Sequence, residues 1–258
     1  MASNSQGITI KSDRELGLMR EAGKIIAEAK IAVRNAISVG VTSQEMDELT
    51  EEIIRKKGAI PSFKGYQPSI NMPPFPATIC FSFNEEIVHG IPSNRKMKSG
   101  DIVSVDFGAI VDGFHGDSAF TVGVGEISNQ AKKLIETTEQ SLNVGIEKAI
   151  IGNRLTDISN AVQVFAENRK FSVVREYVGH GIGRNLHEEP QVPNYGAPGR
   201  GPVLRSGMVL AIEPMLNVGT WRTKIMNDGW TIVTEDGKLS AHFEHTVAIT
   251  TDGPEILT

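Results

Sequence analysis

Two aspartates that flank a tight turn are the first candidates for chemistry in this sequence of 258 residues. Asp106 lies in a run of β-branched and aromatic residues, where aspartate is normally depleted. Asp112-Gly113 is a strong hairpin-turn signal. If these two residues form the loop, Asp117 lies opposite Gly108, and Asp106 and Asp117 share one face, about 7–8 Å apart at the backbone. Their oxygens can then converge on one point; alternatively, one carboxylate caps a turn and the other faces solvent.

A glycine-flanked histidine is the second candidate. His180 lies in the stretch VGHGIGRNLHEEP, where Gly179 and Gly181 let the backbone bend closely around it, and His187 follows in the same stretch. A dinucleotide-binding fingerprint, G-x-G-x-x-G, is excluded because it would require glycine where Ile182 or Arg184 stands and because no strand-turn-helix pattern surrounds the stretch. A lone histidine is more often a hydrogen-bonded structural residue, but flanking glycines favour space for a ligand or metal.

Two glutamates lie in apolar, strand-like runs: Glu213 in MVLAIEPML and Glu244 in AHFEHTVAI. A buried ionised glutamate must be neutralised, paired or bound to a metal. Together with Asp106, Asp117 and His180, these residues predict a shared site for two divalent ions, which would balance four carboxylates. Paired ions can polarise a carbonyl and supply hydroxide near neutral pH. Oxygen donors with one imidazole favour manganese, iron or cobalt over a thiol-rich zinc site.

The composition excludes several classes of protein. A hydrophobic share of 40% and a charged share of 22% are typical of a folded globular chain. The net charge of −5, without a basic run, argues against nucleic-acid binding. Cys80 is the only cysteine, which excludes a disulfide framework and favours a reducing compartment. With neither a signal peptide nor a membrane-length apolar run, we expect a soluble, cytoplasmic protein.

The first half of the chain predicts two helices followed by strands. Capping boxes at Ser12 and Thr42 each begin a helix. The first helix is expected to run to about Ile37, and Gly58 is expected to close the second. Short β-like runs broken by glycine follow over 78–124.

The second half repeats this order. Ser128 is expected to begin a third helix that ends near Gly152, and Thr156 or Asp157 a fourth. Strand-like runs follow, clearest at 207–216 and 242–249.

Helix, helix and antiparallel strands therefore occur twice, over about 11–125 and 126–250. We predict a flexible segment over 1–10 and a single α+β domain over 11–258. Either the elements of one domain happen to alternate twice, or two similar units pack with pseudo-two-fold symmetry around a site between them.

Dispersed motifs connect these observations to a known family. FNEEIVHGIP, VDFGAIVDGFHGD, GHGIGRNLHEEP, MVLAIEPM and HFEHTV occur in this order, and nearly the whole chain resembles the type I methionine aminopeptidases of the M24 metallopeptidases. The resemblance implies the pita-bread (creatinase/aminopeptidase) fold of two pseudo-symmetric halves. It also implies hydrolysis of the N-terminal methionine from nascent proteins and peptides, with a preference for a small second residue. A hydroxide activated by two divalent metal ions (cobalt, manganese, iron or zinc) would carry out this reaction.

The resemblance also implies the metal ligands. Asp117 and Glu244 would bridge both metals, and Asp106 would bind one of them. His180 and Glu213 would bind the other, and Glu213 would also handle the proton of the bridging water.

Other residues would contact the substrate. His89 resembles the family's histidine near the scissile amide nitrogen, and His187 resembles the one that hydrogen-bonds the substrate and stabilises the oxyanion. Residues 67–74 form a longer link than the family usually has. For Tyr66 and Phe75, which flank this link, packing in the core is therefore the alternative role. The pocket for the methionine side chain would be formed by Tyr66, Phe75, Cys80 and Trp230.

Three rival interpretations have discriminating features. X-Pro peptidases of the same fold carry an extra N-terminal domain, whereas this chain reaches its first catalytic motif by His89. Type II methionine enzymes have a long helical insertion between the last two glutamate ligands, and non-catalytic pita-bread binding proteins have typically lost ligands. We expect nascent N-termini (deformylated in bacteria) as partners, with the ribosome as a further candidate. We expect no binding to nucleic acid or to a membrane, and we expect a monomer.

Overall fold

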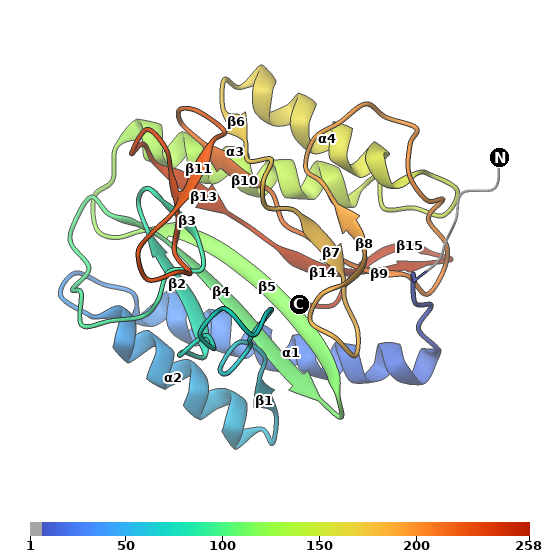
Figure 1. The fold of residues 1–258 in the computed structure, drawn as a ribbon, viewed down its shortest axis with the longest axis horizontal. Helices are drawn as coiled ribbons and strands as arrows, with labels where there is room; N and C mark the ends of the chain where they lie inside the picture. The colour runs from blue at the N-terminus through green and yellow to red at the C-terminus, as the bar shows by residue number, and fades with distance from the viewer. Residues whose placement is uncertain (1–6) are drawn as a thin grey trace.

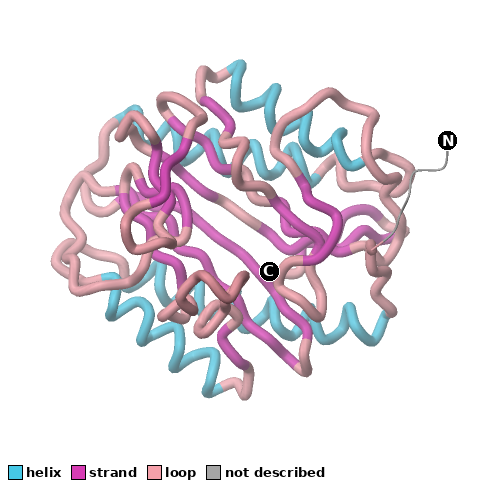
Figure 2. Tube along the Cα trace, viewed as in Figure 1, coloured by secondary structure: helices cyan, strands magenta, loops and turns pink. Residues whose placement is uncertain are grey.

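The computed structural model describes residues 7–258, so residues 1–6 of the predicted flexible segment 1–10 lie outside the described residues. The helices lie along two opposite sides of the molecule, with the strands between them (Figure 1). Long, irregular connections surround the strands on the side that faces the viewer in Figure 2. Among the helices of residues 7–258, none is long and apolar enough to cross a membrane.

The first helix pair begins at the predicted caps. Helix α1 (Asp13–Ala36) follows Ser12, and helix α2 (Ser43–Lys56) follows Thr42. In both, the cap hydroxyl accepts a hydrogen bond from the third helical N–H, while the glutamate there accepts one from the cap N–H, so both capping boxes are confirmed. Gly58, at φ 75°, ends α2 as predicted. The apolar face of α1 packs against the long hairpin described below.

The second helix pair differs from the prediction at two ends. Helix α3 (Asn129–Ile146) begins after Ser128 as expected but stops before the predicted end near Gly152, because short turn bonds replace the helical ones after Ile146. Helix α4 (Leu155–Asn168) begins earlier than Thr156 or Asp157. The Asp157 carboxylate accepts the Arg154 N–H (2.8 Å) from the third helical position, so this acid stabilises the first turn from inside the helix.

The central hairpin has the predicted register. Strands β4 (Ile102–Val111) and β5 (Phe114–Gly123) pair with Asp117 opposite Gly108. Asp112 and Gly113 form the turn with φ of 46° and 80°, the left-handed conformation that a two-residue hairpin turn requires. Strands β1 (Ile60–Pro61) and β2 (Ile79–Phe83) pair with the other edge of β4.

Three further sheets complete the fold. The five-stranded sheet has the order β15-β14-β9-β7-β8. Its strands are β7 (Gly179–Gly181), β8 (Glu188–Val192), β9 (Val209–Ile212), β14 (His245–Thr250) and β15 (Gly253–Ile256). One small sheet combines β13 (Ser240–His242), β10 (Met215–Asn217) and β6 (Ser172–Val173); the other combines β11 (Thr223–Ile225), β12 (Ile232–Thr234) and β3 (Glu86–Val88). All these pairings are antiparallel, so the predicted α+β class is confirmed.

The strand-like runs 207–216 and 242–249 form strands as predicted, and each contains a break. The first breaks at Glu213-Pro214, between β9 and β10, and the second at Phe243-Glu244, between β13 and β14. Pro214 has no N–H to donate to a ladder, and its carbonyl instead accepts the Phe243 N–H (3.3 Å). Each glutamate therefore lies where the chain passes from one sheet to another.

The two halves are joined directly at these breaks. Ala119 on β5 and Glu244 exchange both backbone hydrogen bonds, at 3.3 and 3.0 Å. The Asp117 N–H donates to Thr246 Oγ1 (2.9 Å) on β14. The main hydrophobic core includes buried residues from both halves. This connection brings the hairpin aspartates to the second-half glutamates.

Candidate metal centre

The two hairpin aspartates face one cavity. Asp106 and Asp117 project from the same side of β4–β5, as the predicted register requires, and both line a cavity of about 380 Å³. Asp117 is only 4% exposed. The Asp106 Oδ1 atom is buried as well, so the alternative in which one of these carboxylates faces solvent is wrong.

His180 comes to the cavity from β7 in the five-stranded sheet. It pairs with Ala211 on β9, and a Cβ on Gly179 would lie 2.3 Å from the Ala211 carbonyl oxygen. A Cβ on Gly181 would lie 2.2 Å from the Glu189 carbonyl oxygen. The flanking glycines therefore make room for neighbouring strands, and His180 itself occupies the cavity wall.

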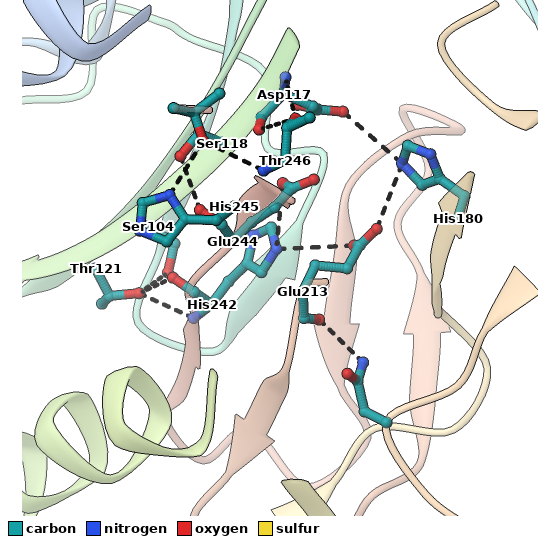
Figure 3. A network of polar contacts seen from close by, with 12 residues as sticks. Ser104, Asp117, Ser118, Thr121, His180, Glu213, His242, Glu244, His245 and Thr246 are labelled. Carbon is teal, nitrogen blue, oxygen red and sulfur yellow. Dashed lines mark hydrogen bonds and ion pairs between the residues drawn. The ribbon is translucent and has the colours of Figure 1, made fainter. Parts of the chain in front are cut away.

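Asp117 from the first half and Glu213 and Glu244 from the second lie on one side of His180 (Figure 3). Its Nε2 lies 3.5 Å from Glu213 Oε1 and 3.8 Å from Asp117 Oδ2. Asp117, His180 and Glu244 each offer a ligand atom, and these atoms lie within 4.8 Å of one another. One cation could contact all three.

Burial controls the protonation of these residues. It raises the pKa of Asp106 to about 7. Burial first, and then the neighbouring acidic groups, raise the pKa values of Asp117, Glu213 and Glu244 well above their usual range. Burial lowers the pKa of His180 to about 3, so its imidazole is neutral and can act as a ligand. Without a cation, the cluster binds protons.

Several polar atoms of the cluster have no hydrogen-bond partner. They include Asp106 Oδ1, Asp117 Oδ1 and Glu244 Oε1, all of them buried. Buried carboxylate oxygens are normally paired, and a divalent cation would satisfy them while replacing the bound protons. Carboxylate oxygens with one neutral imidazole are suitable ligands for hard or borderline divalent ions. The residues therefore fit a metal centre.

Two further nitrogen-bearing side chains, His242 and Lys30, lie beside the cluster, and burial lowers the pKa of His242 to about 3, so its ring is neutral at pH 7. The His242 Nε2 lies 3.8 Å from Glu213 Oε2 and 3.9 Å from Glu244 Oε2, and its ring is 2% exposed. Its position two residues before Glu244 was an available signal, because alternate residues of an extended chain share a face. Lys30 of α1 donates to Ser118 Oγ (2.5 Å), and burial lowers its pKa to about 8. No local pattern marks Lys30.

The two candidate catalytic histidines line the same cavity. His187 packs against His180, with ring centroids 4.4 Å apart, and its Nδ1 is 2.7 Å from the Tyr66 hydroxyl. His89 has a positive φ of 61° and packs edge-on against Tyr177. Burial lowers the pKa of His89 to about 4 and also lowers that of His187, so both rings are neutral at pH 7.

The four residues expected to form an apolar pocket also line this cavity. Phe75 and Trp230 pack edge to face, with centroids 5.1 Å apart. Cys80 pairs with Asp106 across β2–β4, and burial raises its thiol pKa well above the usual range. Tyr66 is half-buried beside His187. Other residues of the cavity lining, among them Phe63, Tyr177 and Leu186, could not be picked out from the sequence pattern.

Comparisons with known proteins agree with this geometry. Residues 17–251 match the model of metallopeptidase family M24. The chain belongs to this family. A methionine aminopeptidase of Clostridium perfringens (strain 13 / Type A) is 55% identical over 251 residues, which cover 97% of this chain and 98% of the relative.

Solved structures extend the comparison of this M24 protein. The crystal structure of methionine aminopeptidase from Thermotoga maritima is 48% identical, has a TM-score of 0.94, and matches over 97% of this chain and 99% of its own. The prolidase from Pyrococcus horikoshii OT3 is 23% identical with a TM-score of 0.77, over 96% of this chain and 63% of its own. The second likeness shows the fold alone. The expected pita-bread fold is confirmed, and membership of M24 implies a divalent metal cofactor.

Proposed function

We propose that this chain is a metal-dependent aminopeptidase that removes methionine from the N-terminus of proteins and peptides. The observation that carries the proposal is a single cavity lined by buried acidic residues, neutral histidines and aromatic residues. The similarity to the relative named methionine aminopeptidase supports the same substrate. The natural substrates proposed are nascent N-termini with a free amine, in the cytoplasm.

The metal-holding residues are assigned as follows. Asp117 and Glu244 would contact both of two divalent ions (cobalt, manganese, iron or zinc), and Asp106 one of them. His180 and Glu213 would hold the other. When bound, such ions polarise a carbonyl group and supply hydroxide near neutral pH. Glu213 would accept the proton of the attacking water at a carboxylate oxygen and pass it to the leaving amine.

The two histidines position and polarise the scissile bond. The pKa of Tyr66 is raised by burial, so its hydroxyl keeps its proton and can donate it in a hydrogen bond to His187 Nδ1. His187 then carries its ring proton on Nε2, which can donate to a developing oxyanion. The neutral ring of His89 can hydrogen-bond the amide nitrogen.

The apolar wall would select the first side chain. A methionine thioether packs favourably against aromatic rings, and Phe75 and Trp230 provide two of them. A cavity of about 380 Å³ is at the small end of ligand-binding pockets. It therefore leaves little room at the second position, where small residues are expected.

The test is metal-dependent release of methionine. Protein stripped with chelator is restored with Mn²⁺ or Co²⁺ and offered Met-Ala-Ser, Ala-Ala-Ser and Met-Pro peptides. Methionine should be released from Met-Ala-Ser only with metal, and Glu213→Gln should reduce the rate by at least about a hundredfold. Equal cleavage of Ala-Ala-Ser would contradict methionine selectivity, and absence of cleavage with every metal would contradict the proposed activity.

A further inference from the structure

A loop of the chain borders the mouth of the cavity. Residues 67–74, called the mouth loop below, connect Tyr66 to Phe75. Pro68 is exposed and Met72 is half-buried, yet both line the same cavity as the buried acidic residues. They therefore lie at the open end of the cavity, away from the metal centre.

The mouth loop is held in place by hydrogen bonds at its base and within it. The Phe75 N–H donates to the Tyr66 carbonyl (2.8 Å), which closes the loop. The Gln67 side-chain amide donates to the Met72 carbonyl (2.6 Å) across it. Trp230 Nε1 donates to the Pro73 carbonyl (3.1 Å), which fixes the loop to the connection between β11 and β12. Met72 also packs against the hydrophobic cluster that contains Phe75 and Trp230.

The connection between β11 and β12 forms the other side of the mouth. Ile225 is 60% exposed and lines the cavity together with Gly229. The Asp228 carboxylate accepts hydrogen bonds from the N–H groups of Trp230 and Thr231, both at 2.9 Å, and these bonds stabilise the conformation of the connection. Both sides of the mouth are preorganised.

The mouth residues that line the cavity, Pro68, Met72, Ile225 and Gly229, carry neither charge nor polar side-chain atoms. The mouth loop contains no charged residue. Lys224 neighbours Ile225 in β11 but does not line the cavity, as expected for adjacent residues on opposite faces of a strand. Exposed apolar side chains that border a functional cavity are typical of ligand contacts.

A peptide substrate must cross this mouth. The inference rests on the proposed function, in which the free amine and the first peptide bond lie against the acidic wall. The small cavity cannot enclose a longer chain, so residues after the second must leave past the mouth loop and the β11–β12 connection. We propose that Pro68, Met72 and Ile225 form a subsite that favours an apolar third residue of the substrate.

The test compares peptides that differ only at the third position. Met-Ala-Leu-Ser and Met-Ala-Asn-Ser have third side chains of similar size but different polarity. We expect kcat/KM to be about fivefold higher for the leucine peptide, as partial burial of one apolar side chain predicts. The variants Met72→Ser and Ile225→Ser should each bring this ratio closer to one. Ile60→Ser is the matched control, because Ile60 is also a strand residue, is 58% exposed and does not line the cavity.

The outcomes separate this inference from the proposed function. A ratio near one in the unmodified protein, or a ratio that neither mouth variant changes, would overturn the subsite. A ratio that Ile60→Ser lowers equally would also overturn it. Failure to release methionine from either peptide, with metal restored, would instead reject the aminopeptidase function on which the subsite depends. Thermal unfolding of the variants checks that the substitutions preserve the fold, above all at the half-buried Met72.

Discussion

Breaking the buried ion pair between Lys11 and Glu188 by removing one partner should destabilise the protein strongly, because this pair connects the N-terminal segment to the candidate site and the remaining charge would be buried alone. Lys11 Nζ lies 2.8 Å from Glu188 Oε2, and the two side chains are 4% and 7% exposed. The Thr9 hydroxyl donates to the same oxygen (2.6 Å), and the Asn185 N–H donates to the other (3.1 Å). Glu188 directly follows His187, so loss of the pair should loosen the segment that carries this histidine.

The expected magnitude follows from the distance and the burial. Two unit charges 2.8 Å apart attract by about 6 kcal/mol at an effective dielectric constant of about 20, and desolvation opposes much of this. Removing one partner leaves the other charge buried and unpaired, which costs about 3–5 kcal/mol. Lys11→Met should therefore lower the free energy of unfolding by about 4 kcal/mol.

The matched control is Arg20→Met. Arg20 pairs with Glu255 at 2.7 Å, but these side chains are 39% and 37% exposed. Solvent screens such a pair, so its loss should cost less than about 1 kcal/mol. Both substitutions replace a basic residue near the N-terminus with methionine.

Urea unfolding of the metal-free protein at pH 7, followed by tryptophan fluorescence, measures both effects. The double variant Lys11→Met with Glu188→Gln should recover part of the loss, because it leaves no unpaired charge.

Burial alone would raise the pKa of Glu188, but hydrogen bonds from Lys11 and Thr9 outweigh it and lower the pKa. The stabilisation is therefore present above the unfolded pKa of about 4.3 and is lost as pH falls through the folded value. A loss for Lys11→Met no larger than that for Arg20→Met would refute the reasoning.

Three further predictions concern other parts of the fold. Gly113→Ala should lower the free energy of unfolding by about 1–2 kcal/mol, because Gly113 has a φ of 80° in the hairpin turn. Gly17→Ala, inside α1 with open space around it, should raise the free energy of unfolding by about 0.5–1 kcal/mol. Urea unfolding measures both, and a change in the same direction for the two variants would contradict this prediction. Cys80, whose pKa is raised by burial, should react slowly with a thiol reagent at pH 8 until the protein is unfolded, and rapid native labelling would oppose this. Burial raises the pKa of Asp106 to about 7, so its contribution to stability is present at acidic pH and is lost as pH rises through 7. The metal-free protein should therefore unfold at lower urea at pH 8 than at pH 6, and Mn²⁺ should remove most of the difference; equal midpoints without metal would argue against it.

Features set by nearby residues could be predicted from the sequence alone. The caps at Ser12 and Thr42 depend on a hydroxyl and a carboxylate three residues apart. The hairpin register follows from the two-residue turn at Asp112-Gly113, and this register places Asp106 and Asp117 on one face. The resemblance of the dispersed motifs to a known family had already indicated the fold that the comparisons confirm.

Features set by distant contacts needed the tertiary structure. Apolar patterning predicted strand-like runs around Glu213 and Glu244, and only the structure shows that both runs break where the chain passes between sheets. Patterning reports whether a segment is buried, and it does not report which sheet the segment joins. Lys30 and its partner Ser118 are 88 residues apart in the sequence, so no local pattern indicates their contact.

The sequence by itself determined the local elements and the residues able to bind a cation. Only the tertiary structure decided that these residues meet in one cavity, with His242 and Lys30 beside them and the mouth loop at its open end. The physical reason is the range of the interactions. A cap or a tight turn gains its stability within a few residues, whereas the backbone pairing of Ala119 with Glu244 forms only when both halves are packed.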